Sequence, residues 1–272
     1  MLEGGGALGY LRAMSRARPP LEDTVVLVTR PATRTSALCR RIREAGGRPV
    51  VLPALVVTAL PPIKSPRPAD YYIFLSAHAV EHGLPHLRAH IPAMNRAVVL
   101  AVGPATAAAL NAAGIRNVET PPTGPAGSEG LLATPCLEAG AVQNRRVILI
   151  CGVGGRMMLA KELRARGAQV ERLEVYRREP AQSDIAGAIR AGGGRRPEVA
   201  VITSVEGMES LSRLIRTQRQ EWLFAVPLVA LSERIAAERL RCGFTAAAYI
   251  APSAGDDGLV AALLEYARAE RS

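Results

Sequence analysis

Cysteine, aromatic residues and long hydrophobic runs are all scarce in this 272-residue sequence. The four cysteines, Cys39, Cys136, Cys151 and Cys242, are scattered and form no C-x-x-C pair, which argues against a zinc site or a disulfide framework and fits a cytoplasmic protein. The longest apolar runs, such as PVVLPALVV and RVILIC, fall well short of the roughly 18 residues that span a bilayer, so we expect no membrane helix. The N-terminal stretch lacks the apolar core of a signal peptide, and we expect residues 1–21 to form a disordered extension.

Several common catalytic motifs are also missing. The sequence contains no G-x-S-x-G, no Walker phosphate loop and no H-E-x-x-H, and no histidine lies near a plausible nucleophile, so hydrolase chemistry is disfavoured. The formal charge is +10, mostly from arginine, and a field of this sign attracts acidic ligands. We do not expect nucleic acid among them, because aromatic residues make up only 4% of the chain and the arginines form no dense block.

The most informative feature is an internal repeat. Residues 26–54 align without a gap with residues 147–175, and both stretches read as strand, turn, amphipathic helix, glycine and strand. Three further matches follow in the same order: IFLSAHAV with VITSVEGM, AVGPATAAAL with ALSERIAAER, and SEGLLA with DDGLVA. The chain therefore holds two copies of one unit, at about 24–139 and 145–272.

Each copy has the pattern of a doubly wound α/β domain. Short runs rich in β-branched residues, at 25–29, 72–75 and 98–102 in the first copy, alternate with helices that end at Gly46 and Gly114. This pattern predicts a parallel sheet covered by helices on both faces. The extended stretches PVVLPALVVTAL and VERLEVYRREP can pass from one domain to the other, but the repeat alone leaves open whether the domains are tandem or exchange segments.

In such sheets, ligands bind beyond the carboxyl ends of the strands, where helix N-termini present free backbone N–H groups. The residues expected there are small or hydroxyl-bearing, which suits close approach of an anion. They are Thr29, Arg30, Ser76, Gly103, Thr106, Cys151, Gly152, Ser204 and Ser232. Two such edges that face each other would form an anion-binding cleft.

The turn CGVGGR at residues 151–156 allows a second interpretation, because it follows a strand and opens a helix as dinucleotide-binding loops do. Met157 occupies the position of the third glycine of that motif, although Glu171 and Glu174 lie about where a ribose-binding acid would fall. The matching turn in the first copy is RPATRT, so we favour a simple tight turn and expect no cofactor.

All four histidines, His78, His82, His86 and His90, recur at every fourth position, a spacing that can align metal ligands along one helix face. Gly83 and Pro85 interrupt that helix, and the second copy has no histidine at the matching positions. We therefore favour a solvated or partly buried helix face and expect no metal.

Tyr176 ends the motif LEVY in the second extended stretch and would lie between the two domains. A phenol there can donate a proton in the cleft, or its ring can simply pack against the interdomain strand.

Taken together, the motifs VLVTRPA, FLSAHAVE, AVGPATAAAL, SEGLL, LEVYRR, VITSVEG and GDDGLVAAL resemble those of the uroporphyrinogen-III synthase family, in order, over about residues 24–268. The resemblance implies two doubly wound parallel-sheet domains that exchange segments and are joined by a two-stranded linker. Domain 1 would hold residues 22–50 and 178–272, domain 2 residues 58–170, and the linker strands residues 51–57 and 171–177.

The resemblance also implies an activity. The family closes the linear tetrapyrrole hydroxymethylbilane into uroporphyrinogen III, inverting ring D and losing water, without a cofactor. Tyr176 would assist departure of the ring A hydroxyl, after which ring D attacks and recloses through a spiro intermediate. The substrate is a polycarboxylate, and the implied contacts to its carboxylates come from Thr29, Arg30, Ser76, Ala77, Gly103, Thr106, Ser204 and Ser232.

One turn departs from the family pattern G-P-x-T. Its second copy reads LSERIA, so that Glu233 and Ile235 stand where proline and threonine are usual. This departure speaks for one rival interpretation, a non-catalytic tetrapyrrole-sensing module of the same fold. A nucleotide-dependent oxidoreductase that uses CGVGGR is a second rival. We favour neither rival and expect a cytoplasmic, monomeric enzyme of tetrapyrrole biosynthesis.

Overall fold

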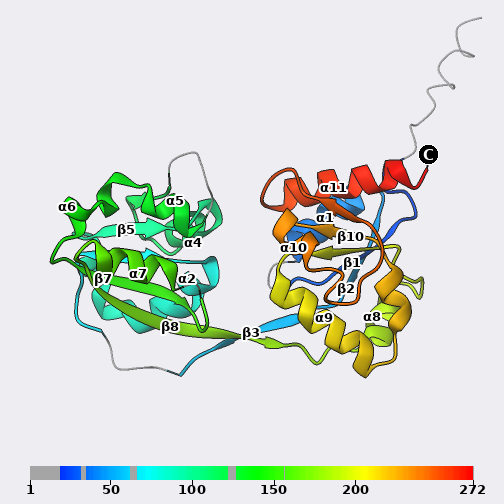
Figure 1. Ribbon diagram of the computed structural model, residues 1–272, viewed down its shortest axis with the longest axis horizontal. Helices are drawn as coiled ribbons and strands as arrows, with labels where there is room; N and C mark the ends of the chain where they lie inside the picture. The colour runs from blue at the N-terminus through cyan, green and yellow to red at the C-terminus, as the bar shows by residue number, and fades with distance from the viewer. Residues whose placement is uncertain (1–18, 32–34, 62–65, 122–126, 156, 272) are drawn as a thin grey trace, which may run out of the picture. The chain divides into compact units, whose positions relative to one another are not determined.

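The structure, a computed structural model, describes residues 19–31, 35–61, 66–121, 127–155 and 157–271. The chain divides into two compact units (Figure 1). Unit 1 holds the residues through Val56 together with those from Pro180 onward, and unit 2 is Val57–Glu179. Within the described ranges, no helix is long and apolar enough to cross a membrane.

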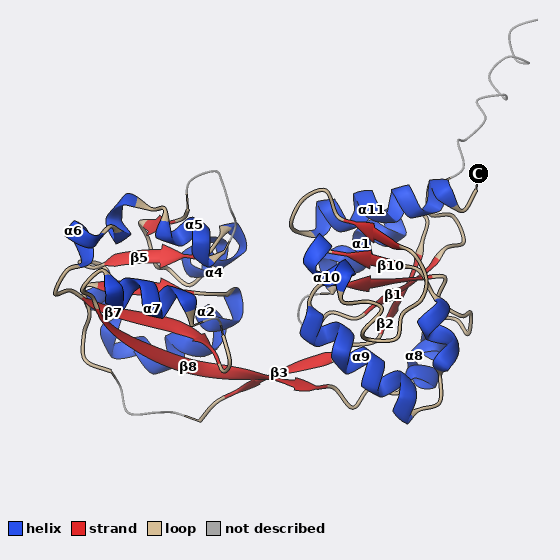
Figure 2. Ribbon diagram, in the orientation of Figure 1, coloured by secondary structure: helices blue, strands red, loops and turns tan. Residues whose placement is uncertain are grey.

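Unit 1 is built on a five-stranded parallel sheet with the strand order β11-β10-β9-β1-β2 and helices on both faces (Figure 2). In chain order its elements are β1 Val25–Val28, α1 Ser36–Glu44, β2 Arg48–Val51, α8 Ile185–Ala191, β9 Val199–Ile202, α9 Val205–Thr217, η5 Glu221–Ala225, β10 Leu228–Ala230, α10 Glu233–Ala237, β11 Ala248–Ile250 and α11 Asp256–Ala269.

The central strand of this sheet shows why the sequence folds in this way. All four residues of β1 are buried, and successive side chains point to opposite faces of the sheet. Val25 and Leu27 pack into a core with Met208 of α9, whereas Val26 and Val28 pack into a second core with α1 and α11. A strand with two buried faces reads as a continuous apolar run, as β1 does.

Unit 2 is built on a six-stranded sheet with the strand order β3-β8-β7-β4-β5-β6. In chain order its elements are β3 Leu55–Ala59, β4 Tyr71–Phe74, α2 Ala77–Gly83, the 3₁₀ helix η3 Leu84–His90, α3 Ile91–Met94, β5 Val98–Ala101, α4 Pro104–Ala112, β6 Val118–Glu119, α5 Ser128–Leu132, η4 Pro135–Leu137, α6 Ala139–Val142, β7 Arg146–Gly152, α7 Met158–Ala165 and β8 Gln169–Pro180. Alternate residues of β4 again face two cores, Tyr72 and Phe74 on the side of α2 and α4, and Tyr71 and Ile73 on the side of α5 and α7.

The two sheets have matching strand orders. Strands β11, β10, β9, β1 and β2 of unit 1 correspond to β6, β5, β4, β7 and β8 of unit 2. The expected fold class, two doubly wound parallel-sheet domains related by an internal repeat, is confirmed. Segment exchange is part of it, because β1 from the start of the chain pairs with β9 and β2, and not with a strand of unit 2.

The chain passes between the units twice, in β3 and in β8. These strands are neighbours in the sheet and run antiparallel, since Leu60 N donates to Val175 O and Ala181 N donates to Ala54 O, each at 3.0 Å. Residues 171–177, expected to be a linker, lie inside β8, which pairs with β7 from Arg146 to Gly152. Most of that stretch is therefore a full strand of the unit 2 sheet.

The N-terminal boundary also differs from the expectation. Residues 1–18 of the expected disordered extension lie outside the described residues. Leu21, however, is fully buried in the core of unit 1, and its N–H donates to Ala45 O at 2.8 Å. The packed chain therefore begins before residue 22, because the apolar side chain of Leu21 covers the end of α1.

Candidate functional site

At the carboxyl ends of β4 and β5, unit 2 presents the start of two helices. Ser76 follows β4 in an extended conformation and caps α2, its Oγ accepting a hydrogen bond from Ala79 N at 3.0 Å. Ala77 is the first residue of α2 and is partly exposed. Gly103 follows β5 and caps α4, and a Cβ added to Gly103 would meet no atom within 4 Å. The space beside Gly103 is therefore open, as the approach of an anion to the α4 N-terminus requires.

Tyr176 lies at the same edge, in β8, and only 3% of its surface is exposed. A bulge between Cys151 and Gly152 places Tyr176 opposite Gly152, the last residue of β7. The ring lies so close to Gly152 that an added Cβ would be 2.7 Å from its Cε2 and Cζ atoms. Glycine is needed here because any side chain would occupy the place of the tyrosine ring.

The Tyr176 hydroxyl has two polar neighbours. Ser76 Oγ is 2.9 Å away, and Arg178 donates from Nη2 at 3.2 Å. The guanidinium of Arg178 also lies 5.5 Å from the centre of the tyrosine ring. A phenol in this position is both oriented by hydrogen bonds and close to a positive charge.

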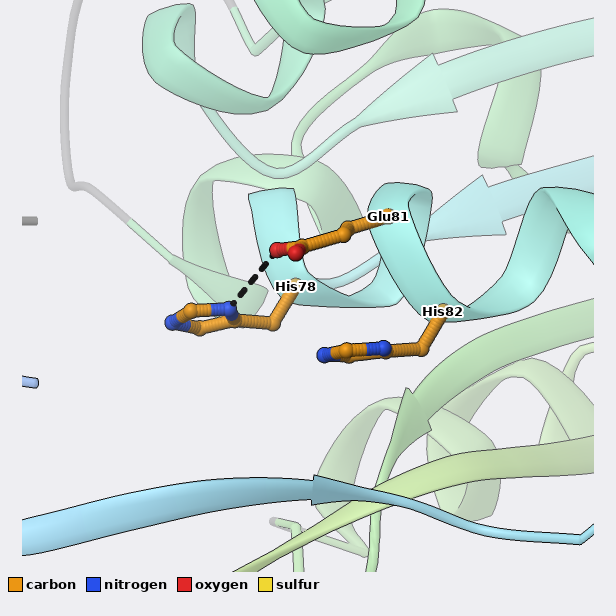
Figure 3. A group of neighbouring side chains, drawn as sticks. All are labelled: His78, Glu81 and His82. Carbon is orange, nitrogen blue, oxygen red and sulfur yellow. Dashed lines mark hydrogen bonds and ion pairs between the residues drawn. The ribbon is translucent and has the colours of Figure 1, made fainter. Parts of the chain in front are cut away.

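Two of the four histidines contact the same ring. The imidazoles of His78 and His82 lie 5.7 and 5.9 Å from the Tyr176 ring, centre to centre, and stack on each other at 6.1 Å. His78 Nδ1 is 3.4 Å from Glu81 Oε2 (Figure 3). Because α2 ends at Gly83, the interruption expected there is observed, and the other two histidines lie in η3.

Those two histidines have separate environments. His86 is partly exposed, whereas His90 is buried and its Nδ1 lies 3.0 Å from the Tyr72 hydroxyl. The pKa of Tyr72 is raised by burial, against the opposing effect of the Ala69 N–H, which donates to its oxygen at 3.1 Å. The four histidines therefore do not share one solvated or partly buried helix face, because His78 and His90 are buried, and only His78 and His82 belong to the surroundings of Tyr176.

At the carboxyl edge of unit 1, two expected contacts are already engaged within the protein. The Thr29 hydroxyl donates to Val201 O at 2.7 Å, so it links β1 to β9 and is not free to donate to a ligand. Arg30 forms an ion pair with Asp256, the first residue of α11, at 2.5 Å. A ligand carboxylate at Arg30 would have to share the guanidinium with Asp256.

The two serines at this edge differ from each other. Ser204 caps α9 as Ser76 caps α2, its Oγ accepting from Gly207 N at 3.0 Å. Ser232 precedes the short helix α10 and makes no side-chain cap bond. Ser76 and Ser204, which are aligned in the repeat, therefore have the same role: each caps a helix by accepting a hydrogen bond from the backbone N–H three residues later.

The unusual turn after Ser232 has a packing explanation. Ile235 is buried in the core of unit 1, and the residue aligned with it in unit 2, Thr106, is also buried, at 4% exposure. The third residue after the residue that precedes the helix is therefore buried in both copies. This finding weighs against the expectation that the Thr106 side chain contacts a ligand, because little of it is accessible.

The structure also assigns roles to the residues of the dinucleotide-type turn. Gly152 is explained by the close approach of Tyr176, and Gly154 by a positive φ of 72°. Glu171 pairs with Arg146 at 2.5 Å and Glu174 with Arg172 at 2.9 Å, so the two candidate ribose-binding acids are already in ion pairs. Burial raises the pKa of Cys151, although the nearby guanidinium of Arg172 opposes this. The tight-turn interpretation is thus the better supported one.

Arg178 is the site residue that the sequence reasoning missed. It stands two residues after Tyr176 in β8. Alternate residues of a strand lie on one face, so the spacing in LEVYRR is a signal that places Arg178 beside Tyr176.

Comparison with known proteins gives a consistent result. Residues 36–261 match the family model described as Uroporphyrinogen-III synthase HemD. A uroporphyrinogen-III synthase of Escherichia coli (strain K12) is 30% identical over 247 residues, which cover 88% of this chain and 99% of that protein. One from Salmonella typhimurium is also 30% identical, over 249 residues, with the same coverage.

Two solved structures share the fold. The crystal structure of uroporphyrinogen-III synthetase from Helicobacter pylori 26695 has a TM-score of 0.60 at 14% identity and covers 90% of this chain and 99% of its own. That of a mutant uroporphyrinogen III synthase from the extremely thermophilic bacterium Thermus thermophilus has a TM-score of 0.54 at 18% identity, covering 91% and 99%.

Proposed function

Because this chain belongs to the uroporphyrinogen-III synthase family, we propose that it performs the family reaction with Tyr176 as the origin of the proton that the leaving group receives. That reaction is a lyase reaction: hydroxymethylbilane loses water and closes to uroporphyrinogen III with ring D inverted. The family expected from the motifs is confirmed. The roles of individual residues are our proposal.

The hydrogen bonds around Tyr176 support a directed proton path. Arg178 donates to the tyrosine oxygen at 3.2 Å, and Ser76 Oγ, 2.9 Å away, accepts from Ala79 N. In our proposal the Tyr176 O–H donates to the remaining acceptor site of Ser76 Oγ, which leaves the serine hydrogen free for the departing hydroxyl of the substrate. Ser76 is the partly exposed member of the pair, whereas Tyr176 is almost fully buried, so the serine is the group that meets the substrate.

When the substrate hydroxyl leaves as water, a proton moves from Ser76 to that oxygen and another from Tyr176 to Ser76. The phenolate that results lies beside the Arg178 guanidinium, which stabilises it by a charge-assisted hydrogen bond. A positioned proton donor typically contributes about 10²- to 10⁴-fold to a rate. Holding ring D so that its substituted carbon attacks supplies the rest by orientation.

Substrate carboxylates would bind at helix N-termini in both units. The two longest candidates are α4, which begins beside Gly103, and α9, which begins beside Ser204; the partial positive charge of a helix N-terminus favours anions there. Backbone N–H groups at Ser76, Ala77 and Ser232 would add contacts of the same kind. Thr29 and Arg30 would contribute less through their side chains, because Val201 O and Asp256 already engage them.

The test is to incubate the protein with freshly made hydroxymethylbilane and separate the type I from the type III product. We expect type III from the wild type. We expect at least a tenfold lower rate from Tyr176→Phe, which keeps the ring against Gly152 but removes the donor. Arg178→Lys keeps a positive charge and should retain more activity than Arg178→Ala. An unchanged rate in Tyr176→Phe would refute the proton path and leave orientation as the only contribution.

Product analysis and calorimetry separate the rival interpretations. Type I alone, which forms spontaneously, would favour a tetrapyrrole-sensing module. Heat on calorimetric titration with NAD or NADP would favour an oxidoreductase.

We also propose that the enzyme is a cytoplasmic monomer. All four cysteines are free thiols, and three of them are buried, which suits a reducing compartment. Sedimentation equilibrium tests the monomer, and activity in the soluble fraction of lysed cells, with none in the periplasmic fraction, tests the location.

A further inference from the structure

Three side chains of α2 that the proton path does not use form a compact set of possible metal ligands. They are His78, Glu81 and His82, and one ligand atom from each lies within 4.8 Å of the other two. Figure 3 shows the Glu81 carboxylate turned toward His78 and the imidazole of His82 beside that of His78. The spacing i, i+3, i+4 brings side chains together on one helix face.

We propose that His78, Glu81 and His82 bind a divalent transition-metal ion of the Zn²⁺ type. Two imidazoles and one carboxylate suit zinc and its neighbours, whereas Mg²⁺ and Ca²⁺ select oxygen ligands. Zinc lies about 2.0 to 2.2 Å from such ligand atoms, so that in a tetrahedral site the ligand atoms of one ion are about 3.4 Å apart. Closing the set from 4.8 Å therefore requires a movement of about 1.4 Å. A change of rotamer in the Glu81 side chain, which is 55% exposed, and rotation of one of the two nearly parallel imidazole rings would supply this movement.

The surroundings prearrange the two imidazoles. His78 is buried, and both rings pack against the Tyr176 ring at less than 6 Å. The contact between His78 Nδ1 and Glu81 already brings a nitrogen and a carboxylate oxygen together at 3.4 Å. An ion that replaces this contact binds side chains that are already neighbours, which lowers the entropy cost of binding.

Three protein ligands leave at least one coordination position of the ion open, as in zinc sites whose fourth ligand is exchangeable. The open position can take water or a carboxylate. The site differs from a four-histidine site, because His86 lies outside α2, in η3, and His90 lies against Tyr72. It also does not involve the Tyr176 hydroxyl, which is directed to Ser76 and Arg178.

The experiment is a titration of the metal-free full-length protein with Zn²⁺ by calorimetry, and with Co²⁺ by its visible absorption. We expect one site per chain. Loss of one ligand in His82→Ala or Glu81→Gln should weaken binding at least about tenfold, since even groups behind the ligands change affinity by 10- to 100-fold. His86→Ala is the matched control, one turn further along the series and outside the set, and it should bind as the wild type does. Far-UV circular dichroism checks that each variant is folded.

Imidazole NMR signals provide a second readout, because the chain has only four histidines. Zinc should shift the signals of His78 and His82 and leave that of His86 unchanged. Tyr176→Phe should retain the metal site while losing activity, so the failure of this inference and that of the proton path are separable. Absence of binding, equal weakening by His86→Ala, or binding that leaves the His78 and His82 signals unmoved would each overturn the proposal.

Discussion

Replacing Gly152 by alanine places a methyl group against the ring of Tyr176. The added Cβ would lie 2.7 Å from Cε2 and Cζ and 3.1 Å from the hydroxyl oxygen. Carbon atoms in ordinary contact are about 3.5 Å apart, so the ring has to retreat by about 0.8 Å. The hydrogen bond between the hydroxyls of Tyr176 and Ser76, now 2.9 Å, cannot keep its geometry through such a movement.

Two effects of different size follow from this displacement. Overpacking of a buried site costs about 1 to 3 kcal/mol of stability. Misplacement of a catalytic group by about 1 Å lowers a rate by about 10²-fold, so the loss of activity should be larger than the loss of stability suggests. We expect kcat for type III formation to fall between about 10- and 100-fold, while the protein remains folded at 25 °C.

The assay is type III formation from hydroxymethylbilane, with thermal denaturation measured in parallel. Gly140→Ala is the matched control, because its Cβ would meet no atom within 4 Å and Gly140 lies in the short helix α6. It should leave activity unchanged and stability equal or slightly higher.

A double-mutant cycle tests the mechanism itself. If Gly152→Ala acts by moving the phenol, it should have little further effect on the rate in a Tyr176→Phe background, where no phenol remains. Fully additive losses of rate in the double variant would refute the reasoning, since the methyl group would then act on something other than the Tyr176 hydroxyl.

Two further predictions concern stability. Ser204→Ala should lower the unfolding free energy by about 1 kcal/mol, because it removes the side-chain cap of α9. Ser232→Ala removes no cap bond and should lower the unfolding free energy much less. Equal losses of stability for the two variants in chemical denaturation would contradict this interpretation of the two serines. The unfolding free energy should fall as pH rises from about 9 toward 12, because burial and the neighbouring Glu119 raise the pKa of Cys136 to about 12, and burial raises that of Tyr266 to about 12. The unfolded chain loses these protons at lower pH than the folded chain, so deprotonation favours the unfolded state. Urea denaturation at several alkaline pH values measures how steeply the unfolding free energy falls with pH, and Cys136→Ala should make this fall less steep. An unfolding free energy that rises over this range would contradict the prediction.

The repeat made most of the fold predictable from sequence. The gapless match of residues 26–54 with 147–175 required the same strand, helix and strand in both, and β1-α1-β2 and β7-α7-β8 are the result. The apolar runs at β1 and β4 indicated strands with two buried faces, which is how they pack. The exchange of segments came only from the family resemblance, because the repeat fits a tandem arrangement equally well.

Side-chain partners far apart in the sequence could not be predicted in the same way. Arg30 pairs with Asp256 across 226 residues, and the Thr29 hydroxyl reaches Val201 across 172. Such contacts depend on which strands are neighbours and on their register, which no local pattern encodes. The proximity of His78 and His82 to Tyr176 is of the same kind, whereas the position of Arg178 followed from strand periodicity and was open to prediction.

The central position of β1 in unit 1 has a consequence for synthesis on the ribosome. Val26 pairs with Val199, so this strand is translated long before β9, one of its two partners in the sheet, exists. At about 5 to 20 residues per second, the ribosome needs roughly 10 to 35 s to reach β9. During that time all of unit 2, whose residues are consecutive, is synthesised, while the fully apolar β1 can pair with β2 on one side only. A strand made before unit 2 is therefore completed on its second side only after unit 2, and until then its open edge needs protection from aggregation.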